Sequence, residues 1–191
     1  MDVDTALMLR FQAGEDVCFE ELVTRFRRPL MGYIYRMVHD AAASEELLQD
    51  AFVRVYQHRQ RYRPDARFST WMYRIVHRLA LNYLRDHRHE LAVPAQVEDA
   101  EESRRQREQA DLHPNVEQAM LAFGEAERRR LRVQQAIAVL PERQRAAVIL
   151  NKYQGFDYEE ISRVLELSVS ATKSLLFRAY GTLRRELRDL L

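Results

Sequence analysis

The chain has 191 residues and a formal net charge of +1, with 47% hydrophobic and 31% charged residues. This length suits one ordinary domain or two small ones, and the hydrophobic fraction excludes a chain that is disordered throughout. No run of 18 apolar residues is present, so the sequence predicts no membrane insertion. The acidic start lacks the apolar core of a secretory leader, and the one cysteine, Cys18, excludes an internal disulfide. We therefore expect a cytoplasmic protein in which Cys18 is a small core residue.

Charge is distributed unevenly along the chain. Residues 1–53 carry a net charge of −5 and residues 54–88 carry +7, whereas residues 89–130 carry −4 and residues 131–191 carry +3. Two basic blocks separated by an acidic one indicate two places that meet a polyanion. Solvated arginine-rich helices are the simpler alternative.

The first predicted helices are separated by capping residues and a proline. Asp4 is a candidate N-cap for a helix that ends near Gly14, and Asp16 for the next helix. Pro29 is expected to end that helix and restart the chain. Asp40 is a candidate N-cap for a further helix, which carries apolar residues on one side and polar residues on the other.

Residues 54–88 combine arginines with aromatic residues. A polar loop at 63–67 precedes a helix from Phe68 to about Arg88. Basic charge follows a nucleic-acid backbone and aromatic rings stack on unpaired bases, so this block favours single-stranded or melted nucleic acid. The alternative is that the aromatic residues belong to the core, which we prefer for Trp71 because it shares an apolar stripe with Ile75.

Two small all-α domains are the predicted architecture. Residues 1–90 form the first domain and residues 129–191 the second, because no segment alternates with the period of a strand. Residues 91–128 are rich in acidic side chains and contain Pro94 and Pro114, which predicts an acidic flexible linker.

The C-terminal segment has the pattern of a helix-turn-helix. Asp157 is a candidate cap for a short helix that ends at Leu165, and Ser168 for the helix that follows. One face of this last helix is apolar, while the other offers small, basic and aromatic side chains that suit the major groove of DNA. A plain helical hairpin would show much of the same pattern.

Several motifs resemble the conserved regions of bacterial sigma factors. Residues 43–52 (ASEELLQDAF) and 68–75 (FSTWMYRI) are similar to sigma region 2. Residues 140–145 (LPERQR), 158–162 (YEEIS) and 168–174 (SVSATKS) are similar to region 4. A short chain with only these two regions resembles the extracytoplasmic-function (ECF) group of the sigma-70 superfamily.

The resemblance implies partners and a division of labour. An ECF sigma factor binds core RNA polymerase and directs promoter-specific initiation, with the linker threaded towards the RNA exit path. Three sets of residues would carry these roles. The polymerase-binding set is Glu46, Gln49, Asp50 and Val53. The set that would melt the −10 element and trap a flipped non-template base is Arg61, Arg63, Asp65, Arg67, Phe68, Arg74, His77, Arg78, Asn82 and Arg85. The set that would read the duplex −35 element is Ser168, Ser170, Ala171, Lys173, Ser174, Phe177 and Arg178.

Further implications concern the free chain. The resemblance implies an anti-sigma factor that holds it, and we expect a monomer without a cofactor. The chain is expected not to be an enzyme, because the chemistry belongs to the polymerase and the sequence shows no catalytic constellation. His87, His89, Glu90 and His113 lack a firm metal-ligand spacing, so we expect no metal site.

This sequence departs from the family pattern at several DNA-facing positions. The family often has Asn where Arg78 stands and Asp where Asn82 stands. It commonly has Arg where Leu175 and Tyr180 stand, which predicts fewer phosphate contacts, weaker −35 binding and a different −35 preference. A Leu175→Arg variant would test this interpretation.

Two other classes remain open on the sequence. An ordinary helix-turn-helix transcription regulator would explain residues 131–191 but not the basic aromatic block. A helical adaptor that binds only proteins would explain both apolar cores, and it predicts no salt-dependent affinity for DNA.

Overall fold

The computed structural model describes residues 2–87 and 116–190, with the side chains of 116–125 excepted, and all regular structure in these ranges is helical. The elements are α1 (Val3–Gln12), α2 (Val17–Val38), α3 (Ala41–Gln57), η1 (Arg59–Arg61), α4 (Phe68–Asp86), α6 (Val116–Ala138), α7 (Glu142–Tyr153), α8 (Tyr158–Leu165), α9 (Val169–Glu186) and η2 (Arg188–Leu190). The predicted all-α fold class is confirmed. None of the described helices combines the length and apolarity that a bilayer crossing requires.

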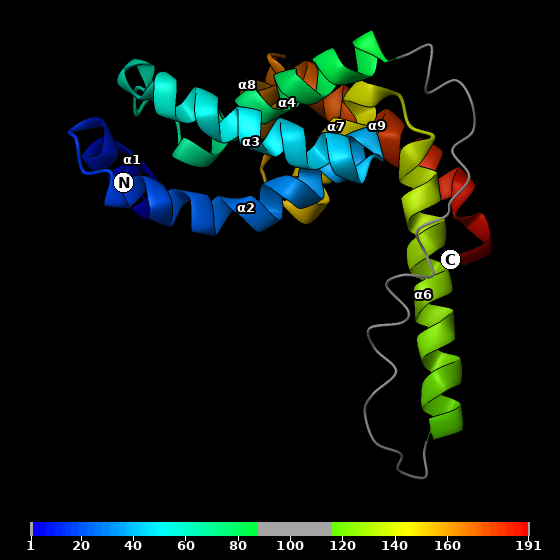
Figure 1. Ribbon diagram of the computed structural model, residues 1–191. Helices are drawn as coiled ribbons and strands as arrows, with labels where there is room; N and C mark the ends of the chain where they lie inside the picture. The colour runs from blue at the N-terminus through cyan, green and yellow to red at the C-terminus, as the bar shows by residue number, and fades with distance from the viewer. Residues whose placement is uncertain (1, 88–115, 191) are drawn as a thin grey trace.

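The first four α-helices form one packed unit. α2 lies along α3, α4 packs on both, and α1 packs on α2 and α4 (Figure 1). The apolar stripe of α2 supplies the centre of the core, since Leu30, Tyr33 and Ile34 have no exposed surface. Cys18 is also buried, at 4% exposure, which confirms its interpretation as a core residue.

Two boundary predictions in this unit are wrong. Pro29 does not restart the chain but lies inside the 22-residue helix α2. Proline removes one backbone donor, but Phe26 before it and Leu30 after it are both buried on the same face, so packing holds the helix together across that position. The N-cap of α1 is Asp2 rather than Asp4, because the Asp2 carboxylate accepts the backbone N–H of Thr5 at 3.0 Å.

Other predicted caps are confirmed. The carboxylate of Asp40 accepts the backbone N–H of Ala43 at 2.9 Å, and the hydroxyl of Ser168 accepts that of Ala171 at 3.1 Å. Asp157 forms a full capping box, in which Glu160 returns a bond to the Asp157 backbone N–H. Asp16 occupies the N-cap of α2 without a side-chain bond.

The C-terminal helices pack against the N-terminal unit. α8 lies on α4 and α7 lies on α2, and the apolar cores of the two halves are continuous. The rings of Tyr73 and Phe156 meet with centroids 5.1 Å apart across this contact. Arg145 of α7 donates to the carbonyl of Met37 at 2.8 Å, and burial lowers its pKa.

Helix α6 overlaps the predicted boundary between the linker and the second domain. α6 starts at Val116, within the expected linker of residues 91–128, and runs without a break to Ala138. Figure 1 shows that the N-terminal part of α6 projects away from the other helices, while its C-terminal part lies beside α9. Residues 91–115 of the predicted linker lie outside the described residues.

Candidate nucleic-acid interface

α9 presents the expected DNA-facing set on its solvent side. Thr172, Leu176 and Ala179 are buried, which fixes the rotation of the helix. All seven predicted −35 residues are exposed: Ser168, Ser170, Ala171, Lys173, Ser174, Phe177 and Arg178. Four of them line an open hollow, namely Lys173, Ser174, Phe177 and Arg178.

The exposed aromatic ring is the most unusual feature of this face. Phe177 is 80% exposed, more than any other large hydrophobic side chain of the part that the structure describes. Lys173 lies with its ammonium 5.9 Å from the centroid of the Tyr158 ring. A solvated Phe between cationic groups suits a surface that meets bases and phosphates at once.

Gly181 lies on the same face, four residues after Phe177. A Cβ added at Gly181 would meet nothing within 4 Å. We therefore expect Gly181→Ala to raise the free energy of unfolding by about 0.5–1 kcal/mol, because alanine restricts the unfolded chain and favours the helix. Urea unfolding followed by circular dichroism measures the change.

Gly32→Ala is the matched control for this prediction. A Cβ at Gly32, also within a helix, would approach Nη1 of Arg36 to 2.8 Å, so the side chain of Arg36 would have to shift. We expect no stabilisation there. Equal gains at the two glycines would contradict the argument.

The interpretation of Leu175 needs correction. Leu175 is only 9% exposed and packs in the core, so it does not occupy a phosphate-facing position in this structure. Tyr180 is half-buried, and its hydroxyl donates to the side-chain oxygen of Asn151 at 2.6 Å. A Leu175→Arg variant would place a guanidinium in the core, which makes it a poor test of DNA affinity.

The predicted −10 set divides into exposed and buried residues. Arg78, Asn82 and Arg85 follow one another along an exposed face of α4, with Arg74 half-buried beside them. The exposed loop members are Arg61, Arg63, Asp65 and Arg67.

Two members of this set do not face solvent. Phe68 is 1% exposed and His77 is 4% exposed, so neither reaches DNA in this arrangement. The resemblance implies a DNA contact for both, but α4 turns their side chains into the core. Phe68 meets the rings of Phe26 and Trp71, and the partly buried Trp71 confirms its interpretation as a residue packed on the core.

His77 lies in a polar environment between the two halves. Its Nδ1 is 2.9 Å from the hydroxyl of Tyr33. Burial is the largest of the effects that lower the pKa of His77 to about 4. Arg143 and Arg78 act in the same direction, and Glu166 opposes them. The imidazole is therefore neutral at physiological pH.

Two arginines of the −10 set are paired with α8. Arg67 donates to Glu160 at 3.0 Å, and Arg78 donates to Glu166. Sequence reasoning missed both carboxylates. The pattern Asp157-x-x-Glu160 was a signal for the capping role of Glu160, but no local signal placed it against a loop 93 residues away.

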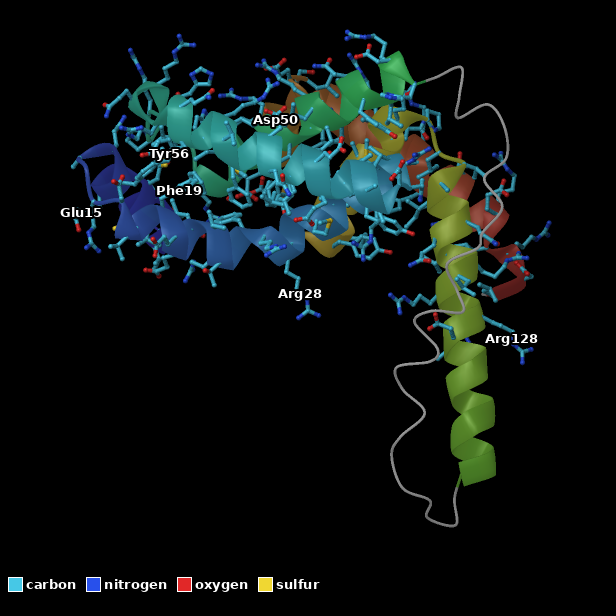
Figure 2. The ribbon with its side chains drawn as sticks, viewed as in Figure 1. Glu15, Phe19, Arg28, Asp50, Tyr56 and Arg128 are labelled. Atoms are coloured by element: carbon cyan, nitrogen blue, oxygen red, sulfur yellow. The ribbon has the colours of Figure 1, made fainter. Side chains whose placement is uncertain are left out.

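The predicted polymerase-binding residues share one face of α3. Glu46, Gln49 and Val53 are exposed, and Asp50 is half-buried and held by Arg54 at 3.0 Å. One turn further on, Tyr56 packs edge-on against Phe19 of α2, with ring centroids 5.4 Å apart (Figure 2). This contact fixes the rotation of α3 and leaves Val53 50% exposed.

Of the residues considered as metal ligands, His87 is the one within the described ranges. No group of three potential ligands occurs among the residues that the structure describes. His89, Glu90 and His113 lie outside them. The ring of His87 stacks on Tyr83, with centroids 4.2 Å apart.

Comparisons with known proteins agree with the motifs. The family model for sigma-70 region 2 matches residues 22–90, and the model for sigma-70 region 4 matches residues 130–183. The RNA polymerase sigma-H factor of Pseudomonas aeruginosa is 34% identical, over 98% of this chain and 95% of its own length. The ECF RNA polymerase sigma-E factor of Escherichia coli is 30% identical, over 98% and 96%.

Solved structures show the same fold at lower identity. CnrH, in complex with the cytosolic domain of CnrY, gives a TM-score of 0.68 at 22% identity and covers 98% of this chain and 99% of its own. The sigma factor RpoE of Bartonella quintana, in complex with the anti-sigma factor NepR, gives 0.63 at 18% identity, over 89% and 96%. The motifs, the family models and the full-length relatives together show that the chain belongs to the ECF group of RNA polymerase sigma factors, which bind core polymerase and direct promoter-specific transcription initiation.

Proposed function

We propose that the two domains of this sigma factor divide promoter recognition between them. Residues 1–90 bind core polymerase through α3 and read the melted −10 strand through α4 and the loop before it. Residues 129–191 read the −35 duplex through α9. The observation that carries this proposal is the exposed face of α9, which holds Lys173, Phe177 and Arg178.

The charge of α9 supports this assignment. The helix has no acidic residue before Glu186, so its exposed face meets the phosphate backbone without repulsion. Ser170, Ala171 and Ser174 are small, which allows the helix to approach base edges in the major groove. An ordinary helix-turn-helix regulator would share this face, but it would leave the region 2 match unexplained.

We propose that the chain performs no covalent chemistry itself. Sigma factors are non-catalytic regulators of initiation, and the polymerase supplies nucleotide transfer. Because its target is the bacterial polymerase, we place its action in the cytoplasm.

An anti-sigma factor is the further partner that we propose. The sigma factor RpoE of Bartonella quintana forms a complex with the anti-sigma factor NepR, and CnrH forms one with the cytosolic domain of CnrY. Both share the fold of this chain. We propose that the free chain is a monomer before capture.

Arg178→Ala tests the −35 assignment. We expect the affinity for a −35 duplex, selected from a random pool by the natural holoenzyme, to fall by about tenfold or more, because the guanidinium contacts a base edge or a phosphate. Fluorescence anisotropy at several salt concentrations measures both the affinity and its salt dependence.

Arg28→Ala is the control, because it removes the same charge from an exposed position on α2. Figure 2 shows Arg28 pointing away from the helices. We expect its affinity to stay within about twofold of the natural protein, since a distant exposed charge is screened. If Arg178→Ala binds the duplex as tightly as the control does, the assignment of Arg178 to the −35 element is wrong.

A further inference from the structure

The second domain contacts the surface of the first domain that we assign to the −10 element, at two arginines that stay largely exposed. Arg67, in the loop before α4, lies 3.0 Å from the carboxylate of Glu160, and Arg78 of α4 bonds to Glu166. We call these two ion pairs the interdomain latch. Both arginines belong to the set assigned to the −10 element.

The latch lies at the edge of a larger contact. The hydroxyl of Tyr73 donates to the side-chain oxygen of Gln154 at 2.6 Å, and Arg36 lies 4.2 Å from the centroid of the Tyr153 ring. The side chain of Glu160 is only 12% exposed, so its charge is held in place rather than solvated. These contacts hold the two domains together, and the latch adds paired charges at the edge of the interface.

We propose that the carboxylates of Glu160 and Glu166 take the place of −10 phosphates, so that the closed chain inhibits its own binding to single-stranded promoter DNA. This inference rests on the proposed −10 role of α4. A carboxylate and a phosphate oxygen accept the same kind of charge-assisted bond from a guanidinium. A carboxylate already paired with the arginine therefore neutralises its charge and repels an approaching phosphate. Glu46, Gln49 and Val53 stay exposed on α3, so polymerase can bind the closed chain first.

Closure lowers the apparent affinity for DNA by the fraction of chains that are open. A change that weakens the latch without touching Arg67 or Arg78 should therefore raise that affinity. Most of the latch is exposed to solvent, since Arg67 and Arg78 are 67% and 62% exposed. The expected gain is modest for that reason, about three- to tenfold for the loss of both pairs.

The test variant is Glu160→Gln combined with Glu166→Gln. Glutamine at position 160 can still accept the backbone N–H of Asp157, so the capping box survives while the charge is lost. The control is Glu20→Gln combined with Glu159→Gln, which removes the same charge from two exposed positions, one of them on α8. Both double variants lose two negative charges, so this control corrects for the rise in DNA affinity that any loss of negative charge would cause.

Two measurements on the full chain decide the outcome. Small-angle X-ray scattering gives the radius of gyration, which rises as the domains separate. Anisotropy gives the affinity for a labelled single-stranded oligonucleotide with the non-template −10 sequence of a promoter that the holoenzyme opens. We expect the latch variant to be larger and to bind three- to tenfold more tightly than the control, while the two variants agree when bound to core polymerase.

Three other results would contradict the masking of DNA by the latch, the −10 role of α4, or the inhibition by closure. If the holoenzyme binds the oligonucleotide but the latch variant matches the control in size and affinity, the latch does not mask DNA. If even the holoenzyme fails to bind it, the −10 assignment of α4 is wrong and the masking falls with it. A larger latch variant with unchanged affinity would show closure without inhibition and would also reject the proposal.

Discussion

Val53→Asp is expected to weaken binding to core RNA polymerase by about a hundredfold. Val53 is 50% exposed on α3, between the turns that carry Asp50 and Tyr56. An exposed aliphatic residue flanked by polar groups is suited to the centre of a protein interface, where an aspartate would be buried without a partner. The folded chain itself should tolerate the change, since the side chain makes few core contacts.

The measurement is competition with the primary sigma factor for sigma-free core polymerase. Val17→Asp is the matched control, because Val17 is 76% exposed in the first turn of α2 and an acidic residue there favours the helix. We expect the control to bind like the natural protein. Equal losses for the two variants would argue against a polymerase-binding face on α3, and no binding by the natural protein would refute the assignment of the whole surface.

The second large effect is expected from pH. The pKa of His77 falls from 6.5 to about 4 on folding, because burial disfavours the imidazolium. Below pH 6.5 the unfolded chain takes up a proton that the folded chain excludes, so the free energy of unfolding decreases as the pH falls. The loss begins near pH 6.5, is complete near pH 4 and amounts to about 3 kcal/mol.

His77→Gln separates this contribution from other titrating groups. Glutamine keeps a polar partner for Tyr33 but does not titrate, so the loss of stability between pH 7 and pH 4 should shrink by about 3 kcal/mol. Urea unfolding at a series of pH values measures it, and His58→Gln, at an exposed position after α3, is the control. Parallel pH profiles for the natural protein and His77→Gln would contradict the assignment.

Capping residues and apolar periodicity predict where most helices begin, but they do not predict that α2 continues through Pro29. Asp40, Asp157 and Ser168 were recognisable as caps because the bond that a cap accepts lies within three residues of it. Pro29 was misjudged because the packing of Phe26 and Leu30 against other helices outweighs the local preference.

The candidate site was predictable where it depends on one helix face. The exposed side of α9 and that of α3 follow from periodicity alone, and the structure exposes both. Phe68 and His77 were misplaced because their burial depends on α2 and α8, which no local pattern positions. For the same reason the ion pairs of Arg67 and Arg78 with the second domain could not be read from the sequence.

The carboxylate of Glu160 makes one bond to the cap of its own helix and one bond to the other domain. One oxygen caps α8 through the backbone N–H of Asp157, while the other holds Arg67 of the first domain. When the domains part, the second oxygen exchanges its partner for water and the first keeps its bond. The opening that we propose would therefore leave the cap of α8 intact. The second domain could then move as a rigid body and present α9 to DNA without fraying α8.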